Sequence, residues 1–374
     1  ENQHYGIMDS LDVLLDWRKN EQLNYLLSIN TDFFSPAYPG DNHKYFHAGA
    51  VGKILPCFYI HGLPTHVGHA YEGFSVTLAA SEIMRQMELR ADFADEYNGE
   101  LPGPPLSLRS RDLKPSYNVT SPEACFMYFN YFIHNESMTV IMDRLRSVAQ
   151  QAMDFVNEHT DTQFRRYCER SGDTYHSIKY PTQVLEYSEL YSMAEKECPN
   201  VADEVKQITD RELAKDTDRR EMSLMIVERL FELCHITVPT TVIFLAPPYC
   251  PRNTMKQSVP EEKILVDDVR AMLDEMGEVM GENVKLMQFF PVLSDSSYLK
   301  IDDTSIEKLI GNFPGYGTVY NVPFDKIKAM NVPAFSFGCY GKDGHKWTER
   351  VNLPYTFGKL PSIIFAALER YLIK

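Results

Sequence analysis

The sequence predicts an α/β protein in which one helix-and-strand unit is interrupted by a smaller α+β unit. From residue 240 to the C-terminus, helices and strands alternate, beginning with a continuous apolar strand at 240–246. Between 53 and 187 the order is strand, helix, strand, strand, helix, strand, which is typical of a split βαβ unit. Outside that region, Asp32 and His345 each follow a predicted strand. Ligands of open α/β sheets bind at such strand ends.

The first fifty residues predict a helix and a strand. Apolar residues at helical spacing predict a helix over 6–17. Residues 23–29 predict a strand, and prolines and a glycine at 36–40 indicate the loop beyond it. Asp32 lies just past the strand end, either as a ligand at the sheet edge or as a turn residue that ends the strand.

The middle of the chain predicts the interrupting unit. Strands are expected at 53–62, 116–120, 123–132 and 182–187, and helices at 75–89 and from 137 onward. Charged helices follow up to about 233, and then helices at 261–280 and 361–372 with strands at 284–289 and 332–337. We therefore expect a first part of one domain at 1–50, an inserted domain at 51–190, and the second part of the first domain at 191–374.

Composition excludes several classes of protein. The 374 residues carry a net charge of −15, which argues against nucleic-acid binding, because that requires a basic surface. No apolar run approaches the roughly 20 residues of a membrane span. The seven cysteines are scattered and form no CxxC pair, as expected of reduced thiols in a cytoplasmic protein. We expect a cytoplasmic protein without nucleic-acid or membrane partners.

The segment Gly341 to Arg350 is the most informative stretch of the chain. It places His345 in a charged loop framed by glycines, just after the predicted strand at 332–337. Glycine admits backbone conformations that other residues avoid, so such a loop can bring its histidine close to a metal or substrate. The alternative is a surface turn whose charges are solvated. A carboxylate such as Asp32 and a neutral imidazole such as His345 are suitable zinc ligands, but two ligands are not a site.

Several segments together resemble the M20 family of zinc amidohydrolases, and most closely its arginine-utilisation branch. They are Glu1 to Ile7, Ile29 to Asp32, Thr65 to Gly68, Tyr117 to Val119, Ala246 to Tyr249 and Gly341 to Arg350, in order along the whole chain. The resemblance implies a phosphorylase/hydrolase-like α/β zinc-peptidase catalytic domain with an inserted ferredoxin-like α+β lid or dimerisation domain.

The resemblance also assigns roles to residues. Glu1, Asp32 and His345 match metal ligands of a site that holds two zinc ions. His66 matches a lid histidine that stabilises the transition state, typically from the partner subunit of a homodimer; taken alone it is equally a turn histidine. Asn118 matches a lid asparagine that contacts substrate. Ser294 to Ser297 lies where the family carries a Gly-Gly-Ser-Asp-like loop but lacks the glycines. The lid arginine of many relatives has no counterpart near 130.

The family's remaining ligands and its general-base glutamate lie upstream of the position that Glu1 matches. We therefore expect the chain to be the C-terminal portion of a longer enzyme, inactive by itself. The complete enzyme would use zinc-activated water to cleave an amide bond in a small acylated amino acid or short peptide, and the family branch implies a link to arginine catabolism. Two alternatives remain open: a non-catalytic relative that only binds, and an unrelated α/β protein in which Asp32 and His345 are loop residues.

Overall fold

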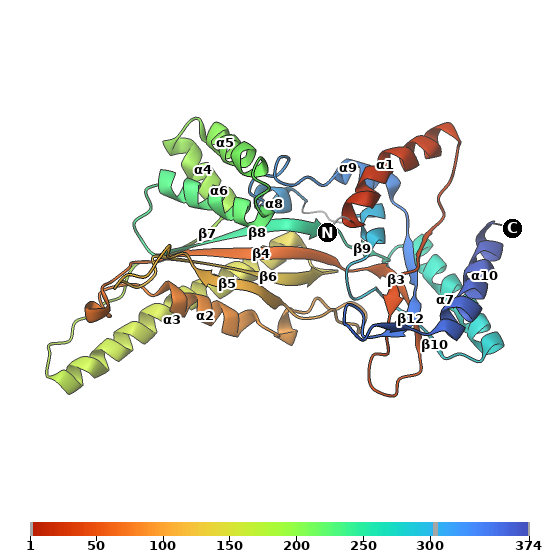
Figure 1. Ribbon diagram of the computed structural model, residues 1–374, viewed down its shortest axis with the longest axis horizontal. Coiled ribbons are helices and arrows are strands. Elements are labelled where there is room, and N and C mark those ends of the chain that lie inside the picture. Colours follow the sequence, from red (N-terminus) through yellow and green to blue (C-terminus); the bar gives the residue numbers. More distant parts are fainter. Residues whose placement is uncertain (1–2, 302–305, 373–374) are drawn as a thin grey trace.

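The computed structural model describes residues 3–301 and 306–372, and residues 3–5 by their backbone alone. Two five-stranded sheets with helices packed on them form the molecule (Figure 1). They are joined directly, because β3 of the first sheet (Lys44–Ala50) ends two residues before β4 of the second (Gly52–His61). The mixed α/β fold agrees with the prediction.

The first sheet has the order β1-β11-β3-β10, with β9 also paired to β3. Its other strands are β1 (Ser28–Asn30), β9 (Asn253–Thr254), β10 (Val284–Met287) and β11 (Ala334–Phe337). β1 and β11 run parallel, as do β3 and β10, whereas β11 and β3 are antiparallel. Helices α7 (Pro260–Met280) and α10 (Leu360–Leu372) pack their apolar side chains against one face. The 3₁₀ helix η3 (Asp295–Leu299) contacts the sheet, and α1 (Gln3–Asn20) and α9 (Phe324–Met330) contact η3.

The second sheet has the order β5-β6-β4-β8-β7. Besides β4, its strands are β5 (Leu106–Asp112), β6 (Ala124–Ile133), β7 (Gln183–Glu186) and β8 (Thr240–Cys250). Helices α2 (Val76–Met87) and α3 (Met138–Ser171) lie on one face, and α4 (Tyr187–Glu197), α5 (Val201–Leu213) and α6 (Arg219–Leu233) on the other (Figure 1). Side chains along β8 alternate between two apolar clusters, so both faces of the strand are covered.

The short elements that remain are η1 (Val67–His69), η2 (Ala91–Phe93), α8 (Ile306–Gly311) and the π-helical segment η4 (Pro354–Lys359). A third small sheet joins β13 (Arg350–Val351), β12 (Cys339–Lys342) and β2 (Phe33–Phe34). This small sheet carries the candidate site.

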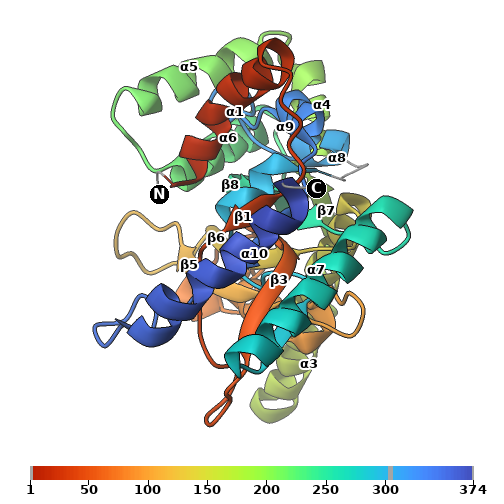
Figure 2. The same cartoon turned by 90° about the vertical axis from the view of Figure 1, so that its right-hand side faces the viewer.

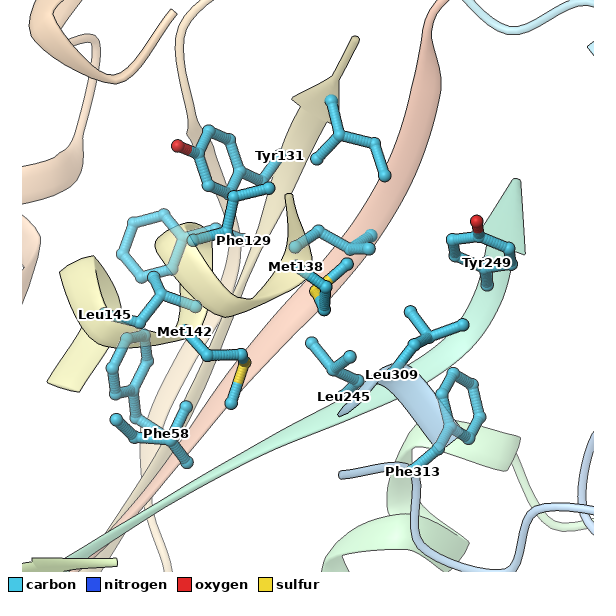
Figure 3. Packing of buried hydrophobic residues seen from close by; sticks show 14 of the residues in the cluster. Phe58, Phe129, Tyr131, Met138, Met142, Leu145, Leu245, Tyr249, Leu309 and Phe313 are labelled. Carbon is cyan, nitrogen blue, oxygen red and sulfur yellow. The ribbon is translucent and has the colours of Figure 1, made fainter. Parts of the chain in front are cut away.

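The largest apolar cluster lies between the second sheet and α2 and α3, and it extends to the helices of the first unit. Met138, Met142 and Leu145 on one side of α3 face Phe58 of β4 and Phe129 of β6 (Figure 3). Tyr249 at the end of β8 belongs to the same cluster as Leu309 and Phe313 (Figure 3). Because this cluster joins the second sheet to α1, α9 and η3, the two units pack against each other through apolar side chains.

The structure corrects three predictions. Residues 116–120 form no strand, and the edge strand is instead β5 at 106–112, whose polar sequence hides its role. β3 at 44–50 was not predicted, because its lysine, histidine and glycine obscure the apolar pattern of a strand that is fully buried. β8, assigned by sequence to the second part of the catalytic domain, pairs with β4 and β7 of the inserted unit. The other boundaries of 1–50, 51–190 and 191–374 stay predictions.

Candidate functional site

Asp32 lies between β1 and β2, and His345 follows the carboxyl end of β12. β1 pairs in parallel with β11, and the following strands β2 and β12 also pair in parallel. The backbone N–H of Cys339 donates to the carbonyl oxygen of Asp32 at 3.0 Å, which ties the start of β12 to the end of β1. The two chain segments therefore leave the first sheet at the same edge.

Glycines let these two segments approach each other. A Cβ atom at Gly338 would lie 2.2 Å from the carbonyl oxygen of Asp32. One at Gly341 would lie 2.4 Å from the ring of Phe33, and one at Gly344 would lie 2.8 Å from the same ring. Real Cβ atoms do not pack at such distances, so the glycines before His345 are required by the packing of its loop against the residue that follows Asp32.

The charged residues around His345 shape its loop. Asp343 and His345 have φ values of 60° and 62°, the left-handed region that non-glycine residues rarely adopt. The Glu349 carboxylate accepts the backbone N–H of His345 at 2.7 Å. Asp343 accepts from the hydroxyl of Thr348 at 3.0 Å and from the guanidinium of Arg350. These bonds fix the backbone conformation of the loop that carries the exposed imidazole. The acidic residues of the loop therefore stabilise its structure.

The carboxyl of Asp32 is half-buried beside another acid. Burial raises its pKa above the ordinary value, the backbone hydrogen bond from Phe33 lowers it, and the charge of Asp295 raises it further. The charge of His345 lowers the pKa of Asp32, so the His345 ring lies within electrostatic reach of that carboxyl. Asp295 was not selected from sequence, although its segment had been matched to a family loop. The amide of Asn30 anchors that loop by donating to the Ser294 hydroxyl at 2.9 Å.

A cavity of about 950 Å³ opens beside His345. One wall is the His345 loop with its cationic neighbours Lys342 and Lys346. The opposite wall is apolar and aromatic, and it includes Phe290 from the loop after β10. The buried His47 of β3 also lines the cavity, and burial lowers its pKa to about 3, so this ring is neutral at physiological pH. A cavity with one apolar wall and a few polar groups suits a small organic ligand.

The donors at this edge fit a transition metal in type but not in number. A carboxylate and an imidazole are first-choice ligands for zinc, and a cation would relieve the repulsion between Asp32 and Asp295. Within residues 3–301 and 306–372, however, no three His, Cys, Asp or Glu side chains gather closely enough to hold a metal. Glu1, the third predicted ligand, lies outside the described residues. The described part of the chain therefore supplies an incomplete donor set.

The segments that carry His66 and Asn118 lie side by side beyond the end of β4. The backbone N–H of Val67 donates to the carbonyl of Val119 at 2.9 Å, so the segment of His66 runs along the loop of Asn118. The backbone N–H of Gly68 donates to Nδ1 of His66 at 3.0 Å. Nδ1 is thereby an acceptor, and in the neutral ring the proton must be on the exposed Nε2. The Asn118 Oδ1 accepts the N–H and the hydroxyl of Thr120, which leaves its amide N–H groups available to a ligand.

Within one chain, the edge that carries Asp32 and His345 lies far from His66 and Asn118. His66 follows the C-terminal end of β4, whereas β4 begins directly beside the first sheet (Figure 1). The ten residues of β4 extend over roughly 30 Å. Asp32, Asp295 and His345 thus form one group at the edge of the first sheet, and His66 and Asn118 form another at the far end of the second.

Comparison with known proteins identifies two similar sequences from Bacillus subtilis (strain 168). Protein RocB is 36% identical over 367 residues, which cover 97% of this chain and 64% of RocB. This chain is therefore similar to RocB along nearly all of its own length. The uncharacterized protein YqjN is 30% identical over 361 residues, again covering 64% of that protein. The chain therefore spans about two thirds of the length of the relatives that it matches. No protein-family model matches it.

Solved structures give weaker similarities. Aminopeptidase PepT from Bacillus cereus aligns with 93% of this chain and 56% of its own, at a TM-score of 0.41 and 9% identity. A tripeptidase from Staphylococcus aureus aligns with 95% of this chain and 58% of its own, at a TM-score of 0.40 and 11% identity. Bacillus subtilis YxeP aligns with 90% of this chain and 54% of its own, at a TM-score of 0.36 and 8% identity. It is described as a dinuclear metal binding peptidase of the M20 family. These scores and identities are too low to assign a family or an activity.

Two predictions about the chain as a whole can be compared with the structure. All seven cysteines lie among the described residues, and none forms a disulfide. None of the helices formed by residues 3–301 and 306–372 has the length and apolar character needed to cross a membrane.

Proposed function

We propose that this chain is part of a metal-dependent hydrolase of amide or peptide bonds, of the M20 type. The observation that carries the proposal is that Asp32, which follows β1, lies within electrostatic reach of His345, which follows β12 and lines a cavity of ligand size. The resemblance of six segments along the chain to the M20 family supports it. The full donor set belongs to the complete protein.

In this proposal Asp32 and His345 hold the metal, with zinc as the expected ion and two per complete site. When bound, the metal supplies a water of lowered pKa and a Lewis acid for the substrate carbonyl. The Phe33 N–H donates to Oδ1 of Asp32 at 2.7 Å and orients that carboxylate. The Glu349 carboxylate accepts the backbone N–H of His345 and so fixes the backbone from which the imidazole extends.

His66 and Asn118 complete the proposed site from a second subunit. The exposed Nε2–H of His66 is a donor that can stabilise the oxyanion as it forms. The free N–H groups of Asn118 can bind a substrate carbonyl or carboxylate. Because these residues lie far from Asp32 in one chain, we propose a homodimer through the inserted unit, in which each inserted unit reaches the partner's metal edge.

The proposed substrate is a small acylated amino acid or a short peptide. The apolar wall of the cavity suits an acyl group or side chain, and Lys342 and Lys346 suit a substrate carboxylate. The proposed setting is arginine utilisation in the cytoplasm, on the basis of the branch of the family that the sequence resembles.

The test is the metal content and amidase activity of the complete protein. We expect about two zinc ions per chain. Asp32→Asn and His345→Gln should each reduce bound metal at least about tenfold. Asp16→Asn and His159→Gln change an exposed acid and an exposed histidine elsewhere and should change neither quantity. Wild-type levels of metal in the Asp32 and His345 variants would contradict the proposal.

A non-catalytic binding protein is the second candidate. It is favoured by the lack of a three-ligand group among the described residues. The complete protein would then contain almost no metal and hydrolyse no acyl amino acid, although it would still bind one.

A further inference from the structure

His47 of β3 is a buried histidine whose ring has no polar partner among the described residues. The residue is 6% exposed. Burial lowers its pKa to about 3, and no charge or hydrogen bond from the described residues acts on the ring. Opposite it on β11 lies Ser336, whose own hydroxyl is also unpaired within residues 3–301 and 306–372. A neutral imidazole offers one donor and one acceptor, and buried groups of this kind are normally paired.

The ring of His47 lies at the deep end of the cavity beside the His345 loop. His47 and the buried Phe290 both line this cavity, and their ring centroids are 5.0 Å apart at an interplanar angle of 82°. The exposed side chains of Tyr38 and Lys346 lie at its mouth. Figure 2 shows the loop at 35–43, which forms another part of the wall, projecting from the sheet before the chain enters β3. A molecule that fills the cavity can therefore reach the unpaired ring.

The acidic residues of the cavity are engaged by their own neighbours. The carboxylate of Asp41 accepts from the hydroxyl of Tyr45 at 2.7 Å and from two backbone N–H groups of its own loop. The carboxylate of Asp343 is bound within the His345 loop. Lys342 and Lys346 are then the charges that the cavity offers to a ligand. The cavity is therefore cationic at one wall, and neutral and polar at its deep end.

We propose that this cavity binds a small molecule with a carboxylate at one end and a neutral hydrogen-bonding group, such as a carboxamide, at the other, and that His47 selects the neutral group. The lysines attract the carboxylate. A carboxamide has one acceptor and donor N–H groups, which match the acceptor and donor of a neutral imidazole.

Other ends of the ligand are disfavoured for physical reasons. An apolar end would bury His47 against a surface that forms no hydrogen bond, which costs the desolvation of both ring nitrogens. A second carboxylate would place a charge beside Phe290 without a counter-ion at the deep end. This inference rests on the proposed function in one respect only: the ligand of a hydrolase of this type would be an acyl amino acid with a side-chain amide.

The first experiment compares three ligands on the wild-type protein as its gene encodes it. They are the N-methanesulfonyl derivatives of glutamine, glutamate and methionine, which have side chains of similar length and a sulfonamide that an amidase does not cleave. Binding is measured by calorimetric titration. We expect the glutamine derivative to bind at least about tenfold more tightly than either of the others, because it alone pairs with His47 without burying a charge.

The second experiment repeats the titrations with variants of His47. His47→Phe keeps a ring of similar size, and it should weaken binding of the glutamine derivative at least about tenfold and that of the methionine derivative less than about threefold. His47→Gln keeps a donor and an acceptor and should retain the preference for the glutamine derivative. His159→Phe changes an exposed histidine of α3 and should alter neither. Melting temperatures show whether the variants are folded, and the wild-type comparison does not depend on them.

The outcomes separate this inference from the proposed activity. It is overturned if the wild-type protein binds none of the three ligands or binds them equally. It is also overturned if folded His47→Phe keeps the wild-type preference, since His47 would then only fill space beside Phe290. None of these measurements requires turnover. A protein that prefers the glutamine derivative but cleaves no acyl amino acid would contradict the hydrolase proposal alone.

Discussion

Single residues determine how closely the two strand ends approach. Gly338, Gly341 and Gly344 have no room for a Cβ atom because the chain at 32–33 packs against them. The sequence pattern suggested glycines that free a histidine to approach a ligand. The structure shows instead that the glycines allow β12 and the His345 loop to pack against β2, and that His345 is positioned as a result.

Replacement of Gly341 by alanine tests this packing. Its Cβ would lie 2.4 Å from both the carbonyl oxygen of Arg350 and the ring of Phe33, so β12 must shift. We expect a loss of about 1–3 kcal/mol in the free energy of unfolding, together with weaker metal binding. Gly6→Ala in α1 is the matched control, because nothing lies within 4 Å of its Cβ position. That change should be neutral or stabilising by about 0.5–1 kcal/mol. Equal effects of the two changes would contradict the packing argument.

The free energy of unfolding at acid pH is expected to depend on His134. Burial, assisted by the charge of Arg252, lowers the pKa of His134 from 6.5 to about 3. Its Nε2 has no hydrogen-bond partner among the described residues. The unfolded chain binds the proton more readily, so the stability contributed by the neutral ring is present above about pH 6.5 and is lost as pH falls toward 3. His134→Phe should therefore reduce the decline in unfolding free energy between pH 6.5 and 4, measured by denaturant titration. A decline as steep as in the wild type would contradict this.

At the scale of elements, the connection from β6 to α3 depends on one buried carboxylate. Oδ2 of Asp95 accepts the backbone N–H groups of His134, Asn135 and Glu136 at 2.6, 2.6 and 2.9 Å. Ser137 then caps α3, because its hydroxyl accepts the N–H of Val140. The sequence indicated the start of this helix, but Asp95 is distant along the chain and gave no signal of its role.

Asp95→Ala should be strongly destabilising. It leaves three backbone donors without their acceptor in a buried place, which costs about 2–5 kcal/mol in the free energy of unfolding. Asp92→Ala, an exposed acid three residues earlier, should change it by less than about 0.5 kcal/mol. Urea denaturation of both variants gives the comparison, and a loss for Asp95→Ala no larger than that for Asp92→Ala would exclude the proposed role.

At the scale of the whole molecule, the proposed function requires two groups of residues that lie far apart in one chain. An apolar cluster packs the second sheet against α1, α9 and η3 of the first unit, so bending of one chain is not expected to close the gap between His66 and His345. In the proposed symmetric dimer, His66 and Asn118 of each copy would complete the site that holds Asp32 and His345 of the other copy.

Mixing of two inactive variants tests this arrangement. His66→Ala and His345→Ala should each abolish amidase activity in the complete protein. After unfolding and refolding as a 1:1 mixture, random dimers should recover about a quarter of the wild-type activity, because half are mixed and each mixed dimer has one intact site. Mixing without subunit exchange is the control. No recovery from refolded dimers, or monomers alone in light scattering, would contradict the shared site.

The sequence by itself determined the α/β class, most of the helices, the covered strand β8 and the placement of Asp32 and His345 at strand ends, because these follow from local periodicity. Tertiary structure alone decided that β8 belongs to the second sheet, that β3 is a strand, that Asp295 joins the site and that His66 lies far from it. Strand pairing and the approach of distant loops depend on contacts between residues far apart in sequence, which hydrophobic patterns along one segment do not encode.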